Sequence, residues 1–165
     1  MTKSTIDSYW NQFLDSLPSA VLRPRRYYEA FHFGTTAESA AELAALVLMG
    51  VKTATGSLLW VYEAEKKPIP QAGDLSIVTD GDGLPRCIIE TTKVLVLPFN
   101  EADEKLAFDG GEGDKSLEYW RGIYWSYIVS ECARIGRRPA PDTPLVCEWF
   151  RVVYRAPLSL RPPDP

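Results

Sequence analysis

Two runs of aliphatic and β-branched residues flank a short turn and constrain the fold more than any other feature of this chain. Leu75 to Thr79 and Arg86 to Leu97 are rich in Ile, Val, Leu and Thr, and Asp80-Gly81-Asp82-Gly83 lies between them. Glycine and aspartate supply the backbone conformations of a tight turn, so this stretch predicts a β-hairpin with a long second strand. A similar run over Leu145 to Arg155 predicts the last strand.

Apolar residues spaced three and four apart predict three substantial helices elsewhere in the chain. The second of them begins at Thr35, with Glu38 three residues later, and ends at Gly50, where a left-handed C-cap costs least. A shorter helical pattern precedes a loop with Pro68, Pro70 and Gly73, after which the sheet is predicted to begin. The predicted helices cover residues 4–17, 35–49, 57–65 and 117–135.

The order of these elements predicts an α+β fold. Strands do not alternate regularly with helices, which argues against a doubly wound parallel sheet and favours a small curved sheet or open barrel with surrounding helices. The 165 residues, 45% of them apolar, are enough for one core. We therefore expect a single domain over residues 1–155 with an N-terminal helical extension, and a disordered tail over residues 156–165, which contain four prolines.

Composition excludes several classes of function. A net charge of −4 argues against tight binding of duplex DNA, which draws affinity from many cationic contacts to phosphate, but it leaves a short or local nucleic-acid ligand open. No phosphate-binding glycine motif appears, and the single histidine, His32, excludes histidine-based triads. The N-terminus has no apolar signal core and no stretch reaches the length of a membrane span, so we expect a cytoplasmic protein without a membrane partner.

The three cysteines, Cys87, Cys132 and Cys147, are widely spaced among apolar residues. They are predicted to be reduced core residues rather than metal ligands or nucleophiles, and no metal or other cofactor is expected.

An amine and two hydroxyls follow the second helix directly, in Lys52, Thr53 and Thr55, with glycines at positions 50 and 56. A sharp turn here could direct Lys52 into a pocket. Burial disfavours the charged ammonium, and an uncharged lysine can act as a base toward a hydroxyl such as that of Thr55. The alternative is a solvated surface lysine beside ordinary turn-forming threonines.

Glu90 interrupts the long strand of the hairpin. Alternation places Ile88 and Glu90 on one face and Lys93 on the other, so Glu90 faces inward if Lys93 faces water. A buried carboxylate needs a partner, and a lysine from another element is one candidate. A strand-edge glutamate paired with an arginine is the alternative.

A polar loop and the start of the next helix carry further candidate groups. Glu112 and Asp114 on the loop, followed by Tyr119, Trp120 and Arg121, could fix the edges of a base and stack on it. Trp120 lies on the apolar stripe of the helix and fits a core position equally well.

Gly50-Val51-Lys52-Thr53-Ala54-Thr55 resembles the G-x-K-x-x-T motif of the ASCH domain family, which implies a PUA-like β-barrel fold linked to RNA binding. The resemblance covers about residues 25 to 155 and is similar to a bacterial branch formerly known as a domain of unknown function. It continues through Ser57-Leu58-Leu59-Trp60, Gly73-Asp74, Cys87-Ile88-Ile89-Glu90-Thr91, Glu112-Gly113-Asp114, Ser116-Leu117-Glu118-Tyr119-Trp120-Arg121 and Val146-Cys147-Glu148.

The resemblance implies two kinds of function. Some ASCH proteins are amidohydrolases that remove the acyl group from N4-acetylcytidine with a Lys, a Thr and a Glu, which match Lys52, Thr55 and Glu90 here. Others resemble single-stranded RNA binders or ribonucleases that use the same cleft, some with a metal ion. The chain departs from the branch at Gly110, where a glutamate is common, and in the stretch Ile123-Tyr124-Trp125, where a histidine is common.

We therefore expect a metal-independent amidohydrolase acting on an N4-acylated cytidine nucleoside, with single-stranded RNA binding or metal-dependent RNA cleavage as the alternative. Lys52, Thr55 and Glu90 are the predicted catalytic set, and backbone N–H groups near Gly56 are predicted to stabilise the oxyanion. The predicted substrate contacts are Thr53, Ser57, Trp60, Glu112, Asp114, Tyr119 and Arg121.

Overall fold

A single curled sheet forms the centre of the structure, a computed structural model that describes residues 3–156. The strand order is β1-β3-β4-β5-β2. β1 runs parallel to β3, and every other neighbouring pair is antiparallel, so the sheet is a mixed half-barrel. The strands are β1 Glu29–Phe31, β2 Ala54–Leu58, β3 Leu75–Thr79, β4 Pro85–Pro98 and β5 Pro144–Arg155.

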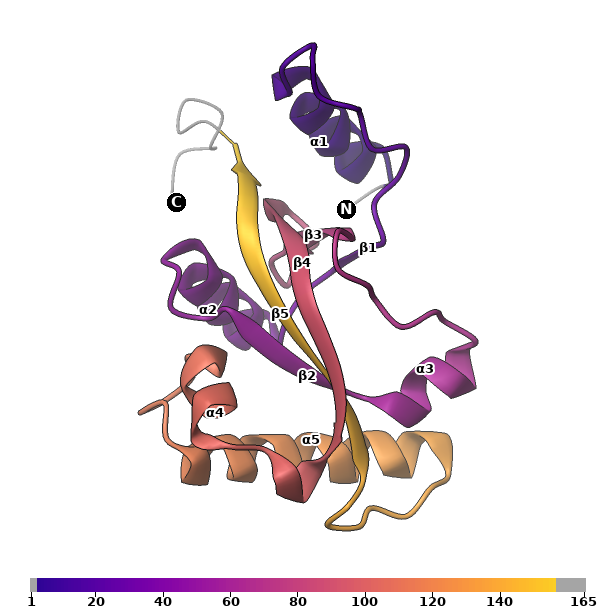
Figure 1. Ribbon diagram of the computed structural model, residues 1–165, viewed down its shortest axis with the longest axis vertical. Helices are drawn as coiled ribbons and strands as arrows, with labels where there is room; N and C mark the ends of the chain where they lie inside the picture. Colours follow the sequence, from indigo (N-terminus) through magenta and orange to yellow (C-terminus); the bar gives the residue numbers. More distant parts are fainter. Residues whose placement is uncertain (1–2, 157–165) are drawn as a thin grey trace.

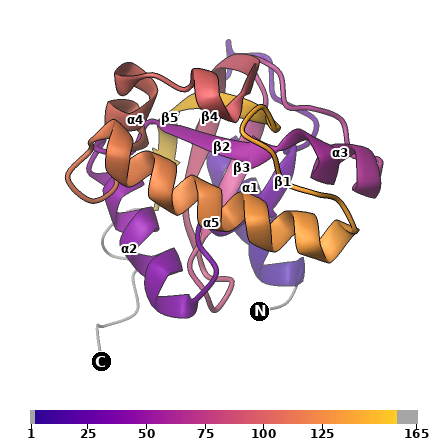
Figure 2. The ribbon, with the colours of Figure 1, turned by 90° about the horizontal axis from the view of Figure 1, so that it is seen from below.

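Helices close both ends and one side of this sheet. In Figure 1, β4 and β5 run nearly the length of the molecule, with α1 at one end and α5 crossing the other. Figure 2 shows α5 passing below β2, from a start near α4 to an end near α3. The helices are α1 Lys3–Ser16, α2 Ala37–Leu48, α3 Leu59–Glu65, α4 Glu104–Gly110 and α5 Leu117–Ile135, with a 3-10 turn over Phe99–Glu101.

The buried apolar residues form three clusters, which lie against α1, against α2, and against α4 with α5. The adjacent residues Ile88 and Ile89 of β4 are both buried because α1 covers the face of Ile88 and α2 covers the face of Ile89. The third cluster joins α4 and α5 to β2 and to the start of β5, where Leu58, Leu145 and Cys147 are fully buried. The site described below lies between the α2 and α5 layers.

Several predictions from the sequence are confirmed. The hairpin of β3 and β4 and the C-terminal strand β5 form where predicted, and α1 and α5 match their predicted spans within a few residues. All three cysteines are free and buried.

The predicted tail lies outside the described residues, apart from Ala156. No helix in the described part of the chain is long and apolar enough to cross a membrane.

Three predictions about local structure are wrong. The sheet does not begin after Gly73, because β1 and β2 precede it; β1 is only three residues long and β2 contains a glycine, so neither has a strong strand pattern. The helix expected from residue 57 begins at Leu59. The cap of α2 is Thr36 rather than Thr35, and Ser39 completes the capping box. The short helix α4 was not predicted.

Candidate functional site

Lys52 is a buried cation held by the end of α2. Gly50 adopts a left-handed conformation, and the backbone N–H groups of Val51 and Lys52 both donate to the carbonyl of Leu46, which turns the chain sharply. The side chain of Lys52 is 1% exposed. Burial of this lysine agrees with the pocket alternative of the sequence analysis rather than with a solvated turn.

Three oxygen atoms surround the Lys52 amine. Nζ donates to the carbonyls of Ala54 at 2.9 Å and Gly110 at 3.3 Å, and it lies 3.2 Å from a carboxylate oxygen of Glu112. An ammonium group donates three hydrogen bonds and accepts none, so this arrangement serves the charged form. All three contacts of Nζ are with acceptor oxygens, a geometry that suits a hydrogen-bond donor and differs from the role of base expected from the sequence.

A glycine-rich loop brings Glu112 to Lys52. Gly111 is left-handed and packs so closely on the backbone of Val51 that a Cβ would overlap the Val51 carbonyl oxygen. Gly113 is left-handed too, and a Cβ there would lie 2.5 Å from the ring of Tyr119. The loop after α4 is thus held between the turn that follows α2 and the first turn of α5.

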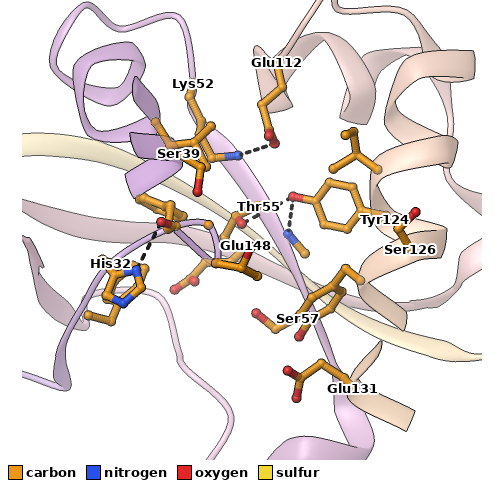
Figure 3. A pocket seen from close by; sticks show the side chains of 18 of the residues that line it. His32, Ser39, Lys52, Thr55, Ser57, Glu112, Tyr124, Ser126, Glu131 and Glu148 are labelled. Carbon is orange, nitrogen blue, oxygen red and sulfur yellow. Dashed lines mark hydrogen bonds and ion pairs between the residues drawn. The ribbon is translucent and has the colours of Figure 1, made fainter. Parts of the chain in front are cut away.

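Thr55 lies on β2 directly opposite Glu148 of β5. Residues paired across antiparallel strands project to the same face with their Cβ atoms about 5 Å apart. Both side chains line one cleft, and Figure 3 shows Glu148 beside Thr55. Thr55 Oγ1 also lies 3.4 Å from the hydroxyl of Tyr124, which accepts the backbone N–H of Gly56 at 3.2 Å.

Glu148 has the environment of a candidate proton carrier. Burial raises the pKa of its carboxyl above the ordinary value of 4.5; the hydrogen bond from Thr91 lowers it, and the nearby carboxylate of Glu29 raises it. Thr91 Oγ1 donates to Glu148 Oε2 at 2.6 Å. A carboxyl whose pKa moves toward neutrality can accept a proton and return it during a reaction near pH 7.

The cleft that contains these groups has a volume of about 800 Å³, within the range of small-molecule sites. Two lysines line it; Lys52 pairs with Glu112, and Lys67 pairs with Glu29. No arginine is among its described lining residues. Its glutamates outnumber its lysines by six to two and are Glu29, Glu42, Glu65, Glu112, Glu131 and Glu148.

Glu90 does not join Lys52 and Thr55, so the expected convergence of these three residues is wrong. Glu90 shares a face of β4 with Ile88, which α1 covers, whereas Thr91 on the opposite face reaches Glu148. Its carboxylate lies 3.2 Å from Arg151 on the neighbouring strand. This geometry is the arginine pairing that the sequence analysis kept as the alternative.

The expected substrate contacts divide into two groups. Ser57, Glu112 and Tyr119 line the cleft. The other four do not line it: the Thr53 hydroxyl contacts the carbonyl of Asp109, Trp60 lies under the guanidinium of Arg137, Asp114 accepts the backbone N–H of Ser116, and Arg121 is exposed on α5. The hydrogen bonds from Ser116 hold the pKa of Asp114 below its ordinary value.

Two functional candidates had no role assigned from the sequence. Glu148 is a single acid inside the apolar strand Val146-Cys147-Glu148-Trp149-Phe150, and an acid in such a run signals a buried carboxylate. Tyr124 lies on the buried face of α5, and no local sequence pattern indicates that its hydroxyl reaches β2.

Comparison with known proteins gives consistent results. A family model described as ASCH domain matches residues 29–154. The crystal structure of an ASCH domain from Lactobacillus crispatus is 34% identical, with a TM-score of 0.87 over 93% of this chain and 97% of that one. Protein EF3133 from Enterococcus faecalis, assigned to the family model DUF984, is also 34% identical, with a TM-score of 0.81 over 92% of this chain and 90% of that one.

A more distant structure, the hypothetical protein PH0355, is 18% identical with a TM-score of 0.50 over 76% of this chain and 96% of that one, which supports the fold alone. No curated protein matched the chain.

Proposed function

Because the chain belongs to the ASCH domain family, whose members are generally RNA-binding or hydrolase-like, we propose that its cleft is the active site of an amidohydrolase. The substrate is N4-acetylcytidine or a related N4-acylated cytosine nucleoside. The observation that carries this proposal is the pairing of Thr55 with Glu148 across two strands, beside the buried ammonium of Lys52.

Thr55 is the nucleophile in this proposal and Glu148 is the base. Its carboxylate takes the proton of Thr55 Oγ1 as the oxygen attacks the acyl carbon, and the positive charge of Lys52 favours the negative charge that develops. Glu148 replaces Glu90 of the sequence-based expectation because it shares the cleft with Thr55, whereas Glu90 lies on the opposite face of β4.

The charges of the cleft favour a nucleoside over an RNA strand. Single-stranded RNA is bound by cationic grooves that follow its phosphates. Here both lining lysines are paired with glutamates, and glutamates outnumber lysines in the described lining. An uncharged nucleoside meets no such repulsion.

The proposed reaction uses side chains of the protein alone. Within residues 3–156, no three His, Cys, Asp or Glu side chains gather in a way that could hold a metal ion. In place of a metal-bound water, Thr55 supplies the nucleophile and Glu148 supplies the base.

Ultraviolet-monitored deacylation of N4-acetylcytidine by the purified protein, with EDTA present, tests the proposal. We expect turnover in the wild type and loss of at least about 100-fold in Lys52→Ala, Thr55→Ala and Glu148→Gln, since each removes a group that acts in the transition state. Full activity in Thr55→Ala would refute the assignment of Thr55 as the nucleophile.

A comparison of Glu148→Gln with Glu90→Gln decides between the two carboxylates. We expect the Glu90 variant to keep most of its activity, because its carboxylate lies against Arg151 and away from the cleft. The reverse result, an inactive Glu90→Gln and an active Glu148→Gln, would return the role to Glu90.

A further inference from the structure

We propose that the phenol of Tyr124 is the hydrogen-bond donor to the acyl oxygen in this reaction, an inference that rests on the proposed function. Tyr124 lies on α5 and is 6% exposed, and its ring stacks on Trp120 with 4.3 Å between ring centroids. The ring is therefore fixed, and its hydroxyl reaches the cleft beside Thr55 (Figure 3).

The hydrogen bonds of Tyr124 leave its proton available. Because the N–H of Gly56 donates to the phenol oxygen at 3.2 Å, the phenol's own O–H is free to donate elsewhere. At rest its neighbour is Thr55 Oγ1 at 3.4 Å. Once Thr55 attacks, the acyl oxygen is bonded to the carbon beside Oγ1 and comes within reach of the same donor.

This geometry also changes the oxyanion donor expected from the sequence. Backbone N–H groups near Gly56 were the expected donors, but the N–H of Gly56 itself is already directed at the Tyr124 hydroxyl. The N–H acts on the oxyanion only through the phenol, which it polarises by donating to the phenol oxygen.

Gly56 and Tyr124 fit each other closely. A Cβ at position 56 would lie 2.9 Å from Cε1 of the Tyr124 ring, which Trp120 prevents from moving aside freely. A glycine in the middle of a strand lowers stability, and it is commonly found where another group approaches closely. Here the approaching group is the tyrosine that the proposal requires.

The reaction can be written with all atoms and protons placed. Thr55 Oγ1 bonds to the acyl carbon, its proton passes to the Glu148 carboxylate, and the carbonyl electron pair moves to the oxygen, which accepts the hydrogen bond from Tyr124. The C–N bond then breaks and Glu148 protonates the leaving N4 amine. Water attacks the threonine ester, giving one proton to Glu148, which returns it to Thr55 as the carboxylic acid leaves.

Tyr124→Phe and Tyr127→Phe form a matched pair for the test. Tyr127 also lies on α5 and also accepts a backbone N–H from β2, that of Leu58 at 3.0 Å. Its hydroxyl therefore lies at Leu58, three residues along β2 from Thr55. Both substitutions keep the ring and leave one backbone N–H without its acceptor, so we expect similar melting temperatures for the two variants.

We expect Tyr124→Phe to lower kcat for N4-acetylcytidine about 100-fold, the loss typical of removing one oxyanion donor, with little change in KM. Tyr127→Phe should keep kcat within about threefold of the wild type, because Tyr127 also lines the cleft but its hydroxyl is bonded at Leu58 rather than beside Thr55. Gly56→Ala, which keeps the hydroxyl but displaces the ring, should lower kcat as well.

The outcomes separate this inference from the proposed function. An active wild type together with an active Tyr124→Phe overturns the role of Tyr124 and leaves the amidohydrolase proposal standing. Equal loss of kcat in Tyr124→Phe and Tyr127→Phe also overturns it, because the effect is then structural. A wild type without turnover overturns both.

Discussion

At the scale of single residues, two glutamates on adjacent strands show how surroundings decide chemistry. Glu90 lies on one face of β4 against Arg151, with 30% of its side chain exposed. Glu148 of β5 is partly buried in the cleft and accepts a hydrogen bond from Thr91. Burial of a carboxyl favours its neutral form, so Glu148 carries a cost in folding stability that an active site can use.

We expect Glu148→Gln to gain stability relative to the wild type as pH rises. Because the pKa of Glu148 is raised, the folded protein keeps a proton that the unfolded chain loses from about pH 4.5 upward, and the wild type loses stability until pH exceeds the folded pKa. The amide has no such proton to lose, and Thr91 can still donate to its oxygen.

Urea unfolding of both proteins between about pH 4 and pH 8 measures this difference. Thr91→Val is an independent check: it removes the hydrogen bond that lowers the pKa of Glu148, so the loss of stability should extend to higher pH. Parallel stability curves for wild type and Glu148→Gln would contradict the explanation.

At the scale of elements, the position of Lys52 depends on three segments that meet around it. The end of α2 turns the chain, β2 carries it into the sheet, and the end of α4 with the loop after it covers the amine through Gly110 and Glu112. Gly111 packs against Val51 at the point where the loop meets the turn.

Gly111→Ala should lower the free energy of unfolding by clearly more than Gly50→Ala. Both glycines are left-handed, with φ near 72° and 74°, so each alanine costs about 1 kcal/mol in backbone conformation. Only at position 111 would the new Cβ also overlap the Val51 carbonyl; nothing lies within 4 Å of a Cβ at position 50.

Chemical denaturation of the two variants isolates the steric contribution, because the conformational cost is shared. Equal destabilisation would show that the loop moves freely away from Lys52. A larger loss in Gly111→Ala, accompanied by reduced deacylation, would link the seating of the loop to the site.

At the scale of the whole molecule, charge separates a nucleoside hydrolase from an RNA-binding protein. The chain has a net charge of −4, and glutamates outnumber lysines in the described lining of the cleft. Neither the total charge nor its distribution in the cleft favours a polyanion. The fold alone does not decide function, because one fold carries many sites.

We expect weak binding of a labelled single-stranded oligonucleotide, with little change between about 50 and 200 mM salt. Fluorescence anisotropy measures the affinity, and an N4-acetylcytidine competitor shows whether any binding uses the cleft. Tight binding that weakens steeply with salt would favour the RNA-binding alternative. Cleavage of the oligonucleotide that EDTA abolishes would instead favour a metal-dependent ribonuclease.

The sequence by itself determined the features that depend on neighbours in the chain. Glycine and aspartate between two apolar runs indicated the hairpin, apolar spacing indicated α1, α2 and α5, and Gly50 placed Lys52 just after a helix. These patterns are informative because turns, caps and amphipathic faces are set by residues a few positions apart.

Only the tertiary structure decided which residues meet in the cleft. Thr55 lies opposite Glu148, and Tyr124 reaches Gly56, through strand register and helix packing between segments distant in sequence. Glu90 and Thr91 are neighbours in β4 but project to opposite faces of the sheet. Thr91 therefore reaches Glu148 in the cleft, whereas Glu90 pairs with Arg151. Register across a sheet is a property of paired strands, and a single strand's pattern leaves open which face becomes the floor of a site.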